Sequence, residues 1–219
     1  MRGMFIGVQC IEVLLSPVRS EPPPEAQATA GCDRRDLLAR HLLGDMSAFA
    51  ELMREFKAPV YSYILRSGVR GGAEDDIFQE VFIKVHGAAS SYQPTRPLEP
   101  WLFTIVANTV RSHFRRQRVR ELADEQGELT PSAPESISAH DIAEAQETVS
   151  WIEQALQSLP LAQREAIILC GMRQLSQQDV SLILGIPVNT VKTHLKRGRD
   201  ALAQALAKRN KALKREVQR

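Results

Sequence analysis

One stretch of this chain lacks lysine and arginine altogether, and it limits the possible folds more than any other feature. Residues 121–147 contain eight acidic residues and no Lys or Arg, and the centre of the stretch contains Gly, Ser, Thr and two prolines. Such a composition is typical of a linker rather than of a packed element. We therefore predict two small domains, at 33–118 and 141–207, joined by a flexible acidic linker at 119–140. A leader at 1–32, disordered or included by a wrongly assigned start, and a basic tail at 208–219 would complete the chain.

Both domains are predicted to be helical, so the fold class is all-α. Aromatic residues make up only 5% of the chain, and apolar residues recur at three- and four-residue spacings. One such stripe begins at Phe49 and ends at Ile64, and Pro59 inside it is expected to kink or divide the helix. A second helix is predicted from Ala73 to Ala89, where Ile77, Val81 and Val85 repeat the stripe and Phe78 and Phe82 widen it. Its opening acids suit a helix N-terminus.

Cysteine usage and apolar runs indicate a cytoplasmic protein. The three cysteines, Cys10, Cys32 and Cys170, are scattered and odd in number, so they do not form a closed disulfide framework. An apolar run at residues 4–15 is interrupted by Gln9 and Glu12 and is too short to span a bilayer. We therefore expect no direct insertion into a membrane.

A third predicted helix, residues 101–118, carries a single sign of charge. Pro100 suits its first position, and the segment from 101 to 120 has five arginines and no acid. A face with Arg, Asn and Ser interleaved is typical of a surface that contacts phosphates and bases, although a merely solvated basic helix remains an alternative. Trp101 and Tyr92 flank the preceding loop and are candidates to stack on an unpaired base, although Trp101 could instead anchor the core. The candidate contacts are Trp101, Asn108, Arg111, Ser112 and Arg115.

The second block contains a helix-turn-helix pattern. Ser176 is expected to cap a helix whose first turn includes Asp179, and Gly185 to end that helix in left-handed geometry. Ile186 would fill the corner, and Asn189 is a candidate cap for the next helix. From residue 187 to the C-terminus there are ten Lys or Arg residues and two acids, a local net charge of +8.

The helix after this turn has the properties of a DNA-recognition helix. Apolar residues at 191, 195 and 202 form its inner face, with Gly198 on the same stripe. Its outer face combines short polar groups, which reach base edges, with cations, which bind phosphates. The candidate contacts are Asn189, Thr190, Lys192, Thr193, Lys196, Arg197 and Arg199.

The sequence contains no motif that indicates catalysis or metal binding. The five histidines, His41, His86, His113, His140 and His194, show no metal-ligand spacing, and no Gly-rich phosphate loop or nucleophile motif occurs. No cofactor and no metal are expected. His113 and His194 fit better as neighbours of phosphates.

Four segments together resemble the extracytoplasmic-function (ECF) group of bacterial sigma factors, within the sigma-70 family. They are AEDDIFQEVFIKV from Ala73, WLFTIVAN from Trp101, LPLAQRE from Leu159, and residues 175–199. The resemblance covers residues 33–207 and implies two helical domains with no catalytic activity. It implies a transcription initiation factor that binds core RNA polymerase, melts the −10 element and recognises the −35 element of promoter DNA. Members are commonly held inactive by an anti-sigma factor, which we therefore expect as a further partner.

The resemblance also assigns roles to the predicted helices. The helix at 73–85 is similar to the surface that docks on polymerase, through Asp75, Asp76, Gln79 and Glu80. The helix at 101–118 is similar to the reader of the −10 element and the helix at 188–199 to the reader of the −35 element. The acidic linker would occupy a basic channel of the polymerase, or would simply be solvated.

A different class of protein also fits part of the pattern. A stand-alone helix-turn-helix regulator accounts for residues 159–207 but leaves the first block and its acidic helix face unexplained.

Overall fold

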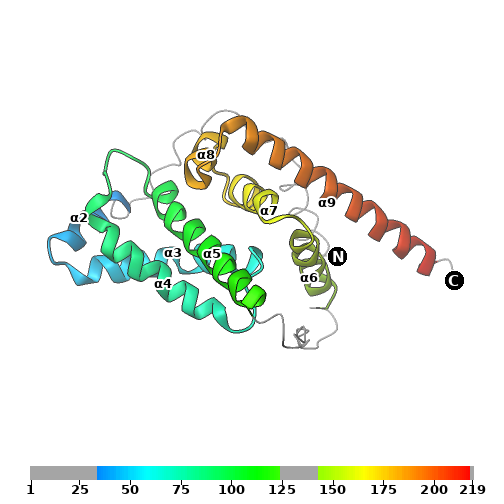
Figure 1. The fold of residues 1–219 in the computed structure, drawn as a ribbon, viewed down its shortest axis with the longest axis horizontal. Coiled ribbons are helices and arrows are strands. Elements are labelled where there is room, and N and C mark those ends of the chain that lie inside the picture. The colour runs from blue at the N-terminus through cyan, green and yellow to red at the C-terminus, as the bar shows by residue number, and fades with distance from the viewer. Residues whose placement is uncertain (1–33, 124–142, 218–219) are drawn as a thin grey trace. The chain divides into compact units, whose positions relative to one another are not determined.

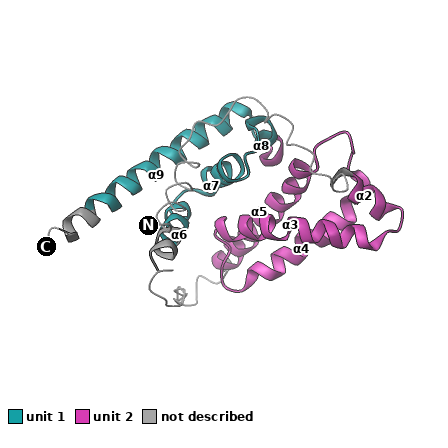
Figure 2. Cartoon of the chain, turned by 180° about the vertical axis from the view of Figure 1, so that it is seen from behind, with its two compact units in different colours: residues 1–22, 135–181, 186–219 teal, residues 23–134, 182–185 magenta. Residues whose placement is uncertain are grey.

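The computed structural model describes residues 34–123 and 143–217, all of whose regular elements are helices. Figure 2 shows two compact units within this described part. We call them the N-terminal unit, which holds the described residues of 23–134 and 182–185, and the C-terminal unit, which holds those of 135–181 and 186–219. The prediction of an all-α fold is therefore confirmed for the described residues.

The N-terminal unit consists of α2 (Arg34–Leu42), α3 (Met46–Arg66), α4 (Ala73–Ala88), the short 3₁₀ helix η1 (Ala89–Ser91) and α5 (Leu98–Ala123) (Figure 1). The predicted stripes of α3 and α4 supply its core. Leu52, Val60, Val81 and Val85 are fully buried, and Tyr63 on α3 meets Phe103 on α5 with ring centroids 5.8 Å apart. Apolar periodicity therefore predicted the packed faces of these helices correctly.

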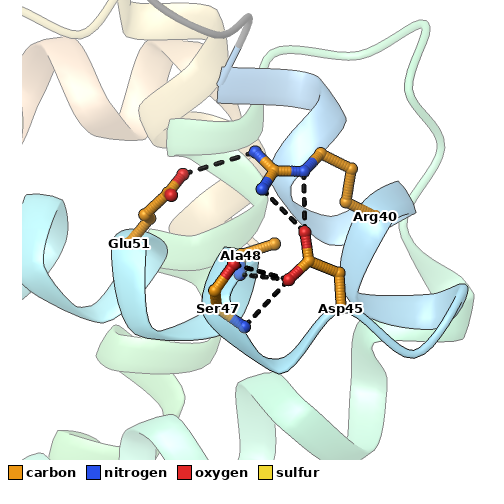
Figure 3. A network of polar contacts seen from close by, with 5 residues as sticks. All are labelled: Arg40, Asp45, Ser47, Ala48 and Glu51. Carbon is orange, nitrogen blue, oxygen red and sulfur yellow. Dashed lines mark hydrogen bonds and ion pairs between the residues drawn. The ribbon is translucent and has the colours of Figure 1, made fainter.

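Asp45 determines where α3 begins. Its carboxylate accepts hydrogen bonds from the backbone N–H groups of Ser47 at 2.9 Å and Ala48 at 3.3 Å, as an N-cap residue does (Figure 3). Arg40, at the end of α2, donates to the same carboxylate from Nε at 3.0 Å and from Nη2 at 2.7 Å. It also reaches Glu51 on α3 at 3.4 Å. One arginine thus connects α2 to the start of α3.

The structure bears on two local predictions for the N-terminal unit. Pro59 lies inside α3, which continues on both sides of it as one helix, so the proline does not divide the helix. α5 extends beyond the predicted 101–118 at both ends, so residues 119–123 of the predicted linker are helical. Pro100 lies in the first turn of α5, where backbone N–H groups have no intrahelical acceptor. The missing N–H group of proline therefore costs the helix no hydrogen bond there.

The C-terminal unit consists of α6 (Ala143–Gln157), α7 (Leu161–Ile167), the π-helical turn η2 (Ile168–Met172), the first part of α8 (Gln177–Leu184) and α9 (Val188–Val217) (Figure 1). Residues 182–184 of α8 are grouped with the N-terminal unit. α7 packs against α9, where Gly198 permits a close approach to Ile167. Cys170 is buried as predicted, and burial raises the pKa of its thiol to about 12. Its environment is therefore that of a core residue.

α9 continues well past the predicted domain boundary at 207. The basic segment that we assigned to a tail is helical as far as Val217. Within it, the guanidinium of Arg209 lies over the ring of Trp151 on α6, 5.0 Å from the centroid. This cation–π contact connects the extension to the rest of the C-terminal unit.

Candidate nucleic-acid interface

Local hydrogen bonds cap the start of α8 and close the turn between α8 and α9, as the sequence predicts. The hydroxyl of Ser176 accepts from the backbone N–H of Asp179 at 3.1 Å and donates to its carboxylate at 2.7 Å, which confirms the predicted cap. Gly185 has φ +64°, and the N–H of Ile186 donates to the carbonyl of Ser181 at 3.2 Å. This is the six-residue pattern of a Schellman motif, which needs the left-handed residue that glycine supplies.

Asn189 is not the cap of α9. The carbonyl of Pro187 accepts from the N–H groups of Thr190 at 2.8 Å and Val191 at 3.1 Å, so Pro187 precedes the first helical residue. Asn189 then lies in the first turn with its side chain exposed. Asn189 therefore stays among the predicted contacts on the exposed side of α9.

The predicted contacts of α9 lie together on one face. Val191 and Leu195 are buried, whereas the opposite side is exposed at Asn189, Lys192, Thr193, Lys196 and Arg197. Thr190 and Arg199 are half-buried at the edges of this face. Partial burial lowers the pKa of Arg199 from its ordinary high value. We call this set the α9 surface.

A shallow open groove of about 470 Å³ runs beside the α9 surface. It is lined by Gln177, Lys192, Leu195, Lys196, Arg199, Asp200 and Ala203. Gln177 and Asp200 were not among the predicted contacts. Gln177 could have been predicted from its place directly after the capping Ser176. That place makes it the first residue of α8, and its side chain lines the groove together with residues of α9. The groove therefore combines three cations with an amide and one acid.

The predicted contacts of α5 also share one face, which we call the α5 surface. Asn108 and Arg115 are exposed, whereas Trp101, Arg111 and Ser112 are half-buried. The guanidinium of Arg115 lies 3.4 Å from the Ser112 hydroxyl. Val119 and Leu122 continue the α5 surface by helical spacing and are 63% and 60% exposed. They were not among the predicted contacts, because the helix was expected to end at 118.

Tyr92 is not available to stack on a base. Its side chain is only 7% exposed, its ring lies 5.2 Å from that of Trp101, and its hydroxyl donates to the carbonyl of Arg96 at 2.7 Å. Tyr92 thus supports the loop before α5, and Trp101 is half-buried beside it.

α4 exposes the predicted acidic face, with one addition. Asp75, Asp76 and Gln79 are exposed, and the Asp75 carboxylate accepts from the hydroxyl of Tyr61 at 3.2 Å. Ile83, one turn further along, is 70% exposed although it is apolar. Ile83 was not among the predicted contacts. We call these four residues and Glu80 the α4 surface.

Glu80 differs from the other acids of α4 because it forms ion pairs within the unit. Its carboxylate binds Lys84 at 2.7 Å and Arg116 of α5 at 2.9 Å. Partial burial raises the pKa of Glu80, but the hydrogen bonds from Arg116 and Lys84 outweigh it and the net shift is downward. Nearby, burial together with the charges of Arg116 and Arg120 lowers the pKa of His113.

Neither 34–123 nor 143–217 holds a group of three or more His, Cys, Asp or Glu side chains placed to ligate a metal ion. Among the helices of these ranges, none is both long and apolar enough to cross a membrane.

Two family models match the chain. Residues 52–120, from α3 to α5, match sigma-70 region 2, and residues 150–202, from α6 to α9, match sigma-70 region 4. The α4 surface and the predicted contacts of the α5 surface therefore lie within the first match, and the α9 surface lies within the second.

Curated proteins also resemble the chain over most of their length. The ECF RNA polymerase sigma factor SigW of Bacillus subtilis is 30% identical over 170 residues, which cover 74% of this chain and 91% of that protein. The ECF RNA polymerase sigma factor EcfG of Rhodopseudomonas palustris is 35% identical over 132 residues, covering 60% of this chain and 70% of that protein.

Solved structures share the fold. The sigma factor RpoE of Bartonella quintana, determined in complex with the anti-sigma factor NepR, is 26% identical with a TM-score of 0.60, covering 73% of this chain and 96% of that one. CnrH, determined with the cytosolic domain of CnrY, is 24% identical with a TM-score of 0.59, covering 80% and 97%.

Proposed function

The chain belongs to the ECF sigma factors of the sigma-70 family, and from this premise we propose how its surfaces divide the work of initiation. As a sigma factor it is a transcription initiation factor that binds bacterial core RNA polymerase and directs it to specific promoters. We assign polymerase docking to the α4 surface, recognition and melting of the −10 element to the α5 surface, and recognition of the −35 element to the α9 surface.

The α9 surface carries the proposal. Its short polar side chains, Asn189 and Thr193, lie in the first turns of a helix that follows a closed turn, and Lys192, Lys196 and Arg197 surround them. In a helix-turn-helix, the first turns of the second helix enter the major groove, while flanking cations bind phosphates. This division predicts that substitutions at the two kinds of position have different effects on binding.

The α4 surface suits a protein partner better than DNA. Asp75 and Asp76 repel phosphates, but they complement a basic protein surface, and the exposed Ile83 offers apolar area beside them. Separate surfaces for polymerase and DNA distinguish a sigma factor from a stand-alone regulator, which needs only the C-terminal unit.

Further partners and the location follow from the same premise. Because the RpoE relative is described in complex with an anti-sigma factor, we infer that this chain is also regulated by one. We place its action in the cytoplasm, where core polymerase transcribes, and assign it no catalytic activity of its own.

The first experiment compares the purified chain with and without core polymerase. Sequencing the transcripts that core polymerase and this chain make on genomic DNA defines the promoters used. A duplex carrying one of these promoters should bind weakly to the chain alone and strongly to the reconstituted holoenzyme. Strong, selective binding without polymerase would favour the stand-alone regulator instead.

The second experiment separates phosphate contacts from base contacts in α9. Lys196→Ala should weaken holoenzyme binding to all duplexes and lower the salt slope by about one unit. Thr193→Ala or Asn189→Ala should instead change which upstream sequence is preferred. An unchanged sequence preference in both would place recognition of the −35 element outside the α9 surface.

A further inference from the structure

Glu80 joins the α4 surface to α5. Its Oε2 accepts from Nη2 of Arg116 at 2.9 Å, and its Oε1 binds Nζ of Lys84 at 2.7 Å. Lys84 also donates to the Thr109 hydroxyl of α5 at 3.2 Å. Both carboxylate oxygens of Glu80 are therefore engaged by cations, one of which belongs to the proposed DNA-reading helix.

Arg116 follows Arg115 of the α5 surface in the chain and is itself exposed. Its side chain is 51% accessible, so solvent reaches the guanidinium even while Glu80 binds it. An arginine is the side chain best suited to a phosphate, because its planar group offers several N–H donors. The adjacent carboxylate cancels much of this attraction and repels a phosphate that approaches the same group.

Glu80 also belongs to the α4 surface, where a basic protein partner would compete for its carboxylate. A cation of the partner and Arg116 would then be alternative ligands of Glu80. Binding at one surface would change the charge available at the other, as thermodynamic linkage requires.

We propose that Arg116 is a further DNA-phosphate-binding residue, that Glu80 neutralises it in the free chain, and that polymerase docking releases it. This inference rests on the proposed function, since it requires that α4 contacts polymerase and α5 contacts DNA. It gives the free chain a lower affinity for DNA than its arginines alone would produce.

The test in the free chain uses a fluorescent mixed-sequence duplex and a series of salt concentrations. Glu80→Gln keeps the shape of the side chain but removes its charge. It should tighten binding several-fold at low salt and raise the salt slope by about 0.9, the value for one added phosphate contact on duplex DNA. Asp76→Asn is the matched control, because it removes the same charge from an exposed position of the same helix.

A double mutant shows whether the effect passes through Arg116. Glu80→Gln should change binding little when Arg116 is already Gln. If Glu80→Gln acts no more strongly than Asp76→Asn, or acts equally with Arg116→Gln present, the effect is general electrostatics and the proposal is wrong. Weaker binding of Glu80→Gln would also overturn it, because Glu80 would then position Arg116 for DNA.

The holoenzyme test uses a promoter duplex identified by the transcript sequencing above, with core polymerase in saturating excess. Wild type and Glu80→Gln should show the same salt slope, and Arg116→Gln a slope lower by about 0.9. A steeper slope for Glu80→Gln in the holoenzyme, or no change for Arg116→Gln, would overturn the proposal.

Arg115→Gln distinguishes this inference from the proposed function. If Arg115→Gln weakens holoenzyme binding while Arg116→Gln has no effect, only the present inference fails. If neither substitution changes holoenzyme binding, the assignment of α5 to DNA fails as well.

Discussion

Individual residues control how closely the helices of this chain approach one another. Gly198 shows it most clearly, because a Cβ atom at this position would lie 2.5 Å from Cδ1 and 3.3 Å from Cγ1 of Ile167. Ile167 is itself buried in the C-terminal unit, so it has little room to move. The glycine therefore serves the packing of α9 on α7 and not a backbone turn.

We expect Gly198→Ala to lower the free energy of unfolding by about 1–3 kcal/mol, the usual effect of overpacking a core. Ile167→Val removes the Cδ1 atom that would clash with the new Cβ. The loss of unfolding free energy in the Gly198→Ala/Ile167→Val double mutant should therefore be smaller than the sum of the two single losses. Gly87→Ala is the control, because nothing lies within 4 Å of a Cβ at that exposed helical site. It should stabilise the chain by roughly 0.5–1 kcal/mol. Denaturant unfolding measures all four variants, and equal effects at 198 and 87 would contradict the packing argument.

Asp45 gives the chain a predictable response to acid. The Ser47 and Arg40 side chains hydrogen-bond its carboxylate and lower its pKa from 3.8 to about 2. Because the folded state holds the proton less tightly than the unfolded state, this carboxylate stabilises the fold above about pH 4. The stabilisation is lost as the pH falls through the folded-state pKa of about 2.

Asp45→Asn should therefore lower the melting temperature at neutral pH, because the amide cannot pair with Arg40 in the same way. The gap from wild type should narrow as the pH falls from about 4 to about 2. Thermal unfolding followed by circular dichroism over this range measures it. A gap that stays constant with pH would show that the lowered pKa of Asp45 does not contribute to stability.

At the scale of the elements, each functional helix combines a buried stripe with a chemically different outer face. α4 is acidic with an exposed apolar residue, whereas α5 and α9 are basic. Because the stripes are buried within each unit, the outer faces are the parts available to partners. Substitutions on those faces should therefore change binding without changing stability.

Ile83 tests this separation on α4. We expect Ile83→Ala to weaken binding to core polymerase by about 5- to 10-fold, because a buried interface contact of this kind contributes more than 1 kcal/mol. The melting temperature should stay close to that of wild type, since the side chain is 70% exposed. Leu43→Ala, at an apolar position 89% exposed after α2, is the control and should bind polymerase normally. Equal effects of the two substitutions would remove Ile83 from the docking surface.

At the scale of the whole molecule, the acidic linker predicted at 119–140 connects the two units. The predicted linker lies outside the described residues except at 119–123, which belong to α5. There Glu121 accepts a hydrogen bond from Gln117 at 2.9 Å. The hypothesis that the acids occupy a basic channel of the polymerase therefore rests on sequence and on the proposed function.

Reversing Glu121, Asp124, Glu125 and Glu128 to Lys should impair initiation more than promoter affinity. Transcript yield and promoter binding by the holoenzyme measure the two quantities on the same DNA. An equal loss of both would favour a linker that is merely solvated or that helps to bind DNA.

The helical faces were predictable because apolar periodicity depends only on the order of residues. The stripe from Leu52 to Ile64, the Ser176 cap and the left-handed Gly185 were all predicted, since each depends on local geometry. The clustering of the contact residues on α5 and α9 followed from the same spacing.

Other features were settled only by tertiary structure. α3 continues through Pro59, and α9 continues past 207 while Arg209 packs on Trp151. The bond between Glu80 and Arg116 joins residues 36 positions apart, so no local pattern reveals it. Local spacing determines which face of a helix is buried, whereas packing between helices determines where the helix ends and which charges meet.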